Sequence, residues 1–311
     1  MTERKYITEF AINAYNDKFV LLEQDDFDND ALDGFLPHIY MIVAREKCVV
    51  PSQTIYCANP KIQVVVDGNK KFFDYRLIEN KQEIKLTKNL SLKVDGIYFR
   101  LTTVTGDLVK EGKISALVTR WIYDGIFNPK IVRALKFEVL YVGQAFGESG
   151  ERLAMDRLKE HSTLQRIYFE YMRLHPNKEV WILLNSFKKQ KIMSMAQSQC
   201  SKADDDKHMQ AIFEKEIPED QLINIIEGTL IRYFQPEYNV QLKESFPCPR
   251  HSSYNECYKL DYNSVSVACT FDQSGGDFGF IIGTNASGYK RDHLISYTFH
   301  NETERKAMFD F

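Results

Sequence analysis

The pattern of hydrophobic and polar residues divides the chain near residue 139. Before this point, short segments rich in β-branched and aromatic residues are separated by turn signals, which is typical of strands. These segments are KFVLL, HIYMIVA, KIQVVVDGNKKFF, EIKLTKNLSLKVDGIYFRLTTV and KISALVTRWIY. They predict that residues 1 to about 115 are mainly β-structure, with a hairpin turn at Asp67-Gly68, where the glycine tolerates positive φ.

After residue 139 the pattern alternates between strands and helices. VLYVG predicts a strand, and residues 150–161 have the apolar spacing of an amphipathic helix. Ser162 and Gln165 form a capping box, which predicts a second helix from about Thr163 to Leu174. VWILLNSF then predicts a buried strand. A loop at about 197–206 follows, and later a helix, PEDQLINIIEGTLIRYF, bounded by two prolines.

The remaining residues return to strand patterns. VSVACTF, DFGFIIG and LISYTF each predict a strand, with Gly275-Gly276 as a turn. We therefore divide the chain into a β-rich region at 1–115, a central α/β unit at 116–245 and a β-rich extension at 246–311.

Composition narrows the class of protein. The chain has 311 residues, of which 44% are hydrophobic and 27% charged, as expected for a globular protein without extensive disorder. No apolar run approaches the ~20 residues of a membrane-spanning helix, and the first residues lack the apolar core of a signal peptide. These features predict a cytoplasmic protein without a membrane partner. A homo-oligomer is possible.

The charged and sulfur-containing residues do not indicate a metal-binding domain. The six cysteines form no CxxC pair, and the spacing of Cys248, His251 and Cys257 fits no familiar zinc finger. Reduced, packed thiols are therefore expected. The acidic run at 23–33 lacks the glycine and the closing glutamate of a calcium loop, which favours a solvated loop.

The net charge of −3 argues against a broad basic face that coats nucleic acid. It does not exclude an enzyme with a local basic groove, because the field at a cleft depends on how charges are arranged. Lys188, Lys189 and Lys191 could follow a nucleic-acid backbone, although a solvated charged face is the favoured interpretation.

Arg157 and His161 are the first candidates for chemistry. Four residues apart, they would share one helix face, with Cβ atoms about 5–6 Å apart. The arginine offers a planar fork of donors for phosphate oxygens, and the histidine can transfer a proton near neutral pH. The alternative is an ordinary exposed helix face, which the spacing alone favours.

Glu227 is a stronger signal, because it lies on or beside the apolar stripe of its predicted helix. A carboxylate in that position is costly unless a partner compensates its charge. A divalent cation would do so, and metal binding is favoured over a solvent-facing glutamate or an ion pair with Arg157.

Tyr141 ends a predicted strand just before Gly143, whose lack of a side chain would allow close approach of another group. A strand tyrosine ordinarily belongs to the core. Its unperturbed pKa is about 10, so it could act as a base only with help from nearby cations.

Together these residues resemble the GIY-YIG nuclease superfamily. YVG at 141–143 resembles the YIG strand, and Arg157 and His161 match the helical Arg-x3-His pair. Glu227, followed by LIRYFQPEYN, resembles the metal-binding glutamate and the closing motif that contains Asn239. The resemblance covers roughly residues 139–242. The first motif is ambiguous: a literal GIY ends at Tyr98, and a degenerate WIY ends at Tyr123.

The resemblance implies an α+β fold with a small antiparallel sheet flanked by helices, to which the β-rich N-terminal and C-terminal extensions are added. It also implies hydrolysis of DNA phosphodiesters with one Mg²⁺ (or Mn²⁺) held by Glu227. Arg157 would stabilise the transition state. Tyr141 or the upstream tyrosine would orient or deprotonate water with His161, while Asn239 would brace the site.

Two other functions remain open from the sequence. The fold could be kept without activity, as a nucleic-acid-binding or regulatory protein. RNA could be the substrate, although no RNA-specific motif is visible. Restriction or phage defence is the expected biological role, by analogy with the family alone.

Overall fold

The computed structural model describes most of the chain. The described residues are 3–23, 35–49, 61–66, 69–74, 77–79, 82–84, 90–123, 129–145, 162–195, 204–271, 279–301 and 304–309.

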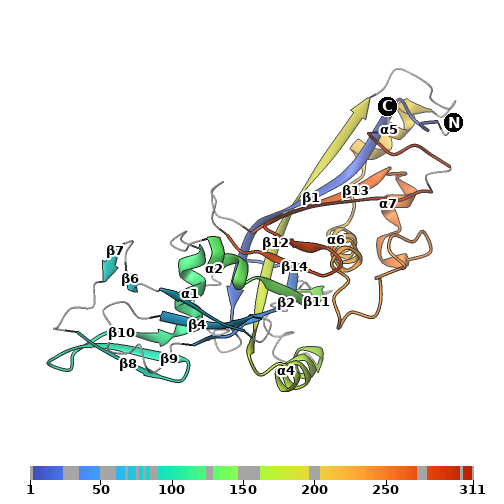
Figure 1. Ribbon diagram of the computed structural model, residues 1–311. Coiled ribbons are helices and arrows are strands. Elements are labelled where there is room, and N and C mark those ends of the chain that lie inside the picture. The colour runs from blue at the N-terminus through green and yellow to red at the C-terminus, as the bar shows by residue number, and fades with distance from the viewer. Residues whose placement is uncertain are drawn as a thin grey trace.

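The protein is mostly β, and its centre is one eight-stranded mixed sheet (Figure 1). In spatial order its strands are β15 (Gly288–Lys290), β14 (Ile282–Thr284), β11 (Phe137–Gln144), β2 (Ile39–Glu46), β12 (Lys178–Met195), β1 (Thr8–Leu22), β13 (Ser264–Thr270) and β16 (Asp292–Thr298).

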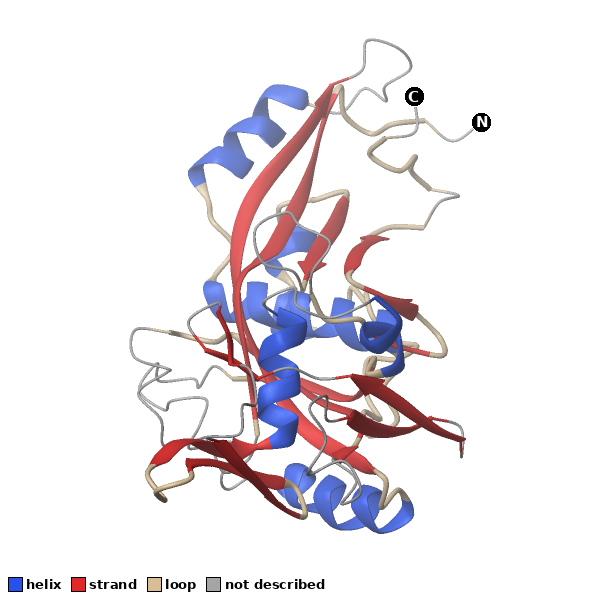
Figure 2. Ribbon diagram, turned by 60° about the vertical axis from the view of Figure 1, so that its left-hand side comes forward, coloured by secondary structure: helices blue, strands red, loops and turns tan. Residues whose placement is uncertain are grey.

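The long strand β12 joins the two halves of this sheet. Its first part pairs antiparallel with β2, from Lys178 opposite Glu46 to Asn185 opposite Ile39. From Ile182 onward it also pairs with β1, which in turn pairs parallel with β13. Figures 1 and 2 show β1 and β12 running along the length of the molecule. Strands distant in sequence are thereby collected into one sheet.

The sheet curls until it nearly closes on itself around helix α6 (Glu219–Phe234). One broad side of this helix is apolar, and residues such as Ile225, Leu230 and Phe234 on that side are fully buried in the larger core. It contacts strands from both halves of the sheet, including β11, β13 and β16. Burial of the apolar side of α6 therefore contributes to the hydrophobic stabilisation of the larger core.

The predicted α+β fold with a small antiparallel sheet is therefore wrong. Two strands of that prediction, VLYVG and VWILLNSF, exist within β11 and β12, but they lie in the middle of the eight-stranded sheet, and the strand between them is β2 instead of a strand with Tyr98 or Tyr123. The sheet is larger because β12 extends well beyond its buried apolar segment and presents a second edge to β1. Strands from near both ends of the chain then continue the sheet.

The opposite face of the central strands is covered by helix α4 (Ser162–Leu174). Its buried residues Leu164, Ile167 and Tyr171 pack against a second core that includes Tyr40 and Ile42 of β2. The capping-box prediction for this helix agrees with its observed start to within one residue. Figure 2 shows α4 near one end of the long strands.

Smaller elements surround this centre. They are β3 (Cys48–Val49), β4 (Lys61–Val66), β5 (Asn69–Asp74), β6 (Leu77–Glu79), β7 (Gln82–Ile84), β8 (Leu90–Asp95), β9 (Tyr98–Thr103), β10 (Leu108–Lys113), α1 (Ile114–Tyr123), α2 (Pro129–Ala134), α5 (Asp205–Glu214), η4 (Ser252–Tyr254) and α7 (Glu256–Lys259). Among the described residues, no helix is long and apolar enough to cross a membrane.

Helix α1 corrects a second prediction. The segment KISALVTRWIY is rich in β-branched and aromatic residues and was expected to be a strand, but from Ile114 it is helical. Ile114, Leu117 and Val118 are buried at helical spacing. Their burial on one face outweighs the local β-propensity, which depends strongly on context.

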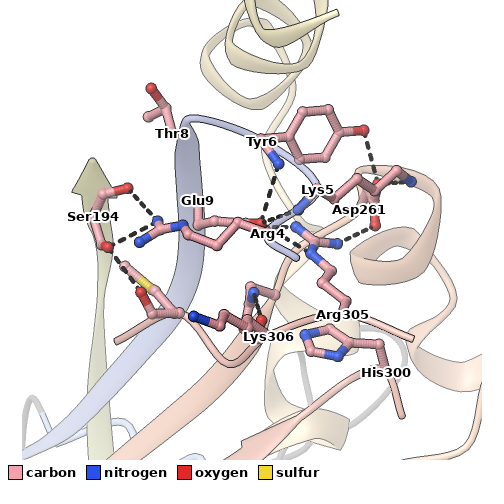
Figure 3. Close-up of polar contacts among 12 residues, drawn as sticks. Arg4, Lys5, Tyr6, Thr8, Glu9, Ser194, Asp261, His300, Arg305 and Lys306 are labelled. Carbon is pink, nitrogen blue, oxygen red and sulfur yellow. Dashed lines mark hydrogen bonds and ion pairs between the residues drawn. The ribbon is translucent and has the colours of Figure 1, made fainter. Parts of the chain in front are cut away.

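A buried ionic cluster holds the two ends of the chain together (Figure 3). The guanidinium of Arg305 hydrogen-bonds with the carboxylates of Glu9 and Asp261, and Glu9 is fully buried. Asp261 also accepts hydrogen bonds from Lys5 and Tyr6. The C-terminal segment is thereby fixed to the start of β1, so that both termini lie at the same end of the molecule.

Candidate functional site

The candidate site begins with two tyrosines on neighbouring strands. In the antiparallel pairing of β11 with β2, Gly143 lies opposite Tyr40. The rings of Tyr40 and Tyr141 are 5.8 Å apart between centroids and are inclined by 31°. A Cβ atom at position 143 would lie 2.7 Å from both rings. Glycine is therefore required at position 143, because any side chain there would collide with the rings of Tyr40 and Tyr141.

An irregularity in β11 sets the direction of these side chains. The register shifts between Val139 and Tyr141, so that Leu140 is an extra residue relative to β2. Tyr141 consequently packs with Tyr40 on the side covered by α4, while Val142 belongs to the core around α6. Bulges of this kind commonly re-aim side chains beside functional sites.

Glu227 approaches the end of the same strand from α6. The side-chain amide of Gln144 donates to Glu227 Oε2 at 2.6 Å and to Asn224 Oδ1 at 2.6 Å. Glu227 is half-buried, with Asn224 one turn before it on the helix. The carboxylate is therefore held at the end of β11, on the α6 side of the sheet, whereas the tyrosines lie on the α4 side.

Asn239 braces the free edge of β11. Its Oδ1 accepts from the backbone N–H of Val142 at 2.8 Å, and its Nδ2 donates to the carbonyl of Val142 at 2.9 Å. The N–H of Tyr238 also donates to the carbonyl of Leu140 at 3.0 Å. The buried amide acts as a neighbouring strand would, and it fixes the backbone between Tyr141 and Gly143.

His38 fixes the other side of the site, at the start of β2. Its Nδ1 accepts from the backbone N–H of Phe187, and its carbonyl accepts from Ala145, both at 2.8 Å. Burial lowers the pKa of His38, although the carboxylate of Glu219, 3.7 Å from Nε2, opposes that shift. A neutral ring at neutral pH is consistent with its acceptor role at Nδ1.

Three of the predicted site residues lie on or beside the second half of β11, but Tyr141 is on the α4 side of the sheet, whereas Glu227 is on the α6 side and Asn239 bonds to the strand backbone. Arg157 and His161 lie outside the residues that the structure describes. The chain resumes with Ser162, the first residue of α4, whose buried side packs against the tyrosine face.

Neither proposed upstream tyrosine lies on a strand that pairs with β11. Tyr98 is half-exposed at the start of β9, in a separate three-stranded sheet. Tyr123 ends α1, and only its backbone is described. The tyrosine beside Tyr141 is instead Tyr40, in the triplet HIY at 38–40. The triplet HIY has the same pattern as the candidate triplet WIY, but HIY lies much further upstream of YVG.

Glu227 Oε2 and Asn224 Oδ1 are oxygen atoms of the kind that bind Mg²⁺, but both accept hydrogen bonds from the amide NH2 of Gln144 in this structure. Within the described ranges, no group of three or more His, Cys, Asp or Glu residues could hold a metal ion. A site with one carboxylate remains compatible with Mg²⁺, which usually keeps several waters and binds substrate phosphates as well.

Comparison with models of protein families, with characterised proteins and with solved structures found no significant match.

Proposed function

We propose that this protein is a metal-dependent endonuclease of the GIY-YIG type that hydrolyses DNA phosphodiester bonds. The observation that carries the proposal is the antiparallel pairing of β2 with β11. It brings Tyr40 of an HIY triplet beside Tyr141 and Gly143 of the YVG triplet. The pairing is informative because the sequence resemblance rested on the residues of β11 and beyond, and not on β2.

In this proposal the described residues have separate tasks. Tyr40 and Tyr141 orient or deprotonate the attacking water, since phenols can accept and donate hydrogen bonds. Glu227 would hold one Mg²⁺ or Mn²⁺ at the end of β11, where a phosphate placed across the strand end would have to meet both the cation and the tyrosines. Asn239 and Gly143 keep the strand backbone in position. Arg157 and His161 retain their proposed roles at the transition state and in proton transfer.

The test is a cleavage assay with purified protein, on plasmid and on single-stranded DNA, with Mg²⁺ or Mn²⁺. We expect Tyr40→Phe, Tyr141→Phe and Glu227→Gln each to lower the cleavage rate by ~10²-fold or more, as for loss of an acid–base or metal-binding group. Tyr98→Phe is the matched tyrosine control, and Glu214→Gln, an exposed position on α5, is the matched acidic control.

Different outcomes separate the alternatives. Cleavage that persists unchanged in Glu227→Gln would remove the proposal. Metal-independent DNA binding without cleavage would favour the inactive binding protein instead. Faster cleavage of RNA than of DNA under the same conditions would keep the site and change its substrate. Loss of activity in Tyr98→Phe, with normal activity in Tyr40→Phe, would reassign the upstream tyrosine.

A further inference from the structure

A pocket of about 370 Å³ lies between the second half of β12 and the segment that leads into α6. Its apolar lining comes from Ile12 of β1, Ile217 and Leu222, all of which are buried. The volume is within the range of small-molecule sites, ~300–1,000 Å³. None of the described residues of the candidate nuclease site is among the described residues that line this pocket, so we consider the pocket separately.

Two lysines stand on the strand that forms one wall of the pocket. Lys189 and Lys191 are two residues apart on β12 and therefore project from the same face of the sheet. Lys189 Nζ pairs with Glu216 Oε2 at 2.7 Å, and Lys191 Nζ donates to the carbonyl of Ile212 at 2.7 Å. A lysine ammonium has three donors, so each retains donors for a further acceptor.

The charge at the pocket favours an anionic ligand. Glu216 is the only acidic residue among the described lining residues, and it faces two lysines. Its pKa is lowered by the hydrogen bond from Lys189 and by the charges of Lys189 and Lys191, so it is ionised at neutral pH. Two positive charges against one negative charge leave an excess that a second carboxylate or phosphate would neutralise.

Tyr262 adds an unused polar group. The residue is 3% exposed and lines the pocket, and its hydroxyl has no hydrogen-bond partner in the part of the chain that the structure describes. Burial raises the pKa of Tyr262 to about 12, with the nearby charge of Glu216 as a further cause, so the phenol stays protonated. This hydroxyl is not among the described side-chain atoms that are both shielded from solvent and unpaired, so it is accessible from the pocket and can donate to a bound acceptor.

We propose that this pocket binds a small organic anion that joins an apolar body to one carboxylate or phosphate group. The apolar body packs against Ile12, Ile217 and Leu222. The anionic group accepts hydrogen bonds from Lys189 and Lys191, and the hydroxyl of Tyr262 donates to the ligand. The proposal is independent of the nuclease activity and stands whether or not DNA is cleaved.

The test measures binding of 2-naphthoate and 2-naphthyl phosphate to the full chain by isothermal titration calorimetry. The neutral analogue 2-naphthamide and the small anion acetate are the matched ligand controls. We expect saturable binding of at least one naphthyl anion at one site per chain, and binding at least ~10-fold weaker for both controls, because each lacks one of the two recognised features. The stronger of the two anions identifies the preferred group.

Variants locate the site. Lys189→Met and Lys191→Met keep the aliphatic stems and are each expected to weaken binding about 10-fold, as for loss of one charge-assisted hydrogen bond. Tyr262→Phe is expected to weaken binding by about 5-fold through loss of one neutral donor. Lys188→Met is the matched control, because Lys188 is adjacent on β12 but lies on the opposite face and pairs with Asp17.

The proposal is overturned by absence of saturable binding to the wild-type chain. It is also overturned if naphthamide binds as tightly as the anions, or if Lys188→Met weakens binding as much as Lys189→Met and Lys191→Met. Circular dichroism spectra and melting temperatures of all variants, compared with the wild type, distinguish loss of the site from loss of the fold.

Discussion

At the scale of single residues, Asn239 has a task that only an amide can perform. Its side chain meets both the N–H and the C=O of Val142, so it needs one acceptor and one donor in fixed positions. Aspartate offers only acceptors when ionised. Aspartate at position 239 would therefore keep the hydrogen bond from the Val142 N–H. It would lose the bond to the Val142 carbonyl and place an oxygen against that carbonyl instead.

We expect Asn239→Asp and Asn239→Ala each to lower the free energy of unfolding by about 1–3 kcal/mol, the cost of leaving buried backbone groups unsatisfied. Urea unfolding measures this change. Val240→Ala is the control, since Val240 is the next residue and is 87% exposed. Equal stability of Asn239→Ala and wild type would mean that this amide does not brace β11.

The same residues mark the limit of what the sequence could predict about the site. Tyr141 and Glu227 were proposed as site residues because each carries a local signal, a strand end before glycine and a carboxylate on an apolar stripe, and Asn239 was proposed because it matches the closing motif of the family. Tyr40 carries no local signal beyond its triplet. Its partnership with Tyr141 is created by strand pairing across a long sequence separation, which a local pattern cannot contain.

At the scale of elements, α6 and α1 show when a local sequence pattern predicts a helix correctly and when it does not. Helix α6 was predicted over nearly its full length, because prolines bound it and its apolar spacing is helical. Helix α1 was missed, because its β-branched and aromatic residues favour a strand locally. For β12, the pattern located the buried part but not the polar extension, whose exposed residues are ordered by pairing with β1.

The packing of α6 depends on a glycine that helix propensity alone would disfavour. Gly228 is buried in the middle of the helix, and a Cβ atom there would lie 2.4 Å from Cδ2 of Phe246. The ring of Phe246 is itself fully buried. The absent side chain therefore allows the segment after the helix to pack directly against the α6 backbone.

We expect Gly228→Ala to destabilise the protein by about 1–3 kcal/mol, because overpacking outweighs the ~1 kcal/mol that alanine gains in a helix interior. Thermal unfolding measures the change. Phe246→Leu removes the clash at the cost of a partial cavity, so the double variant should be less destabilised than the sum of the two single changes. Additive effects, or a stabilised Gly228→Ala, would contradict this packing.

At the scale of the whole molecule, the fold depends on contacts that close the curled sheet. His293, on the edge strand β16, makes two of these contacts. Its Nε2 is 3.1 Å from the carbonyl of Ile282 in β14, near the other edge, and its Nδ1 is 3.0 Å from the hydroxyl of Tyr233 in α6. A carbonyl can only accept, so Nε2 carries the proton and Nδ1 accepts from the tyrosine.

This arrangement requires a neutral imidazole. Burial lowers the pKa of His293 to about 4 from an ordinary value near 6.5. Above about pH 6.5 both the folded and the unfolded states have a neutral ring, and the full stability is present. Between about 6.5 and 4 the unfolded state binds a proton that the folded state does not, so stability falls as the pH is lowered through this window.

We therefore expect the free energy of unfolding of the wild type to fall between pH 7 and pH 4, with His293 contributing about 3 kcal/mol of that loss. His293→Gln keeps a donor and an acceptor but does not titrate, so its stability should fall less over the same range, although it starts lower at pH 7. Urea unfolding at pH 7, 5.5 and 4 measures both slopes, with exposed His251→Gln as the matched control.

Because His38, His208 and His300 also have pKa values lowered by burial, part of the pH dependence of stability should remain in His293→Gln. Identical slopes for His293→Gln and wild type would mean that closure of the sheet does not depend on a neutral ring at this position.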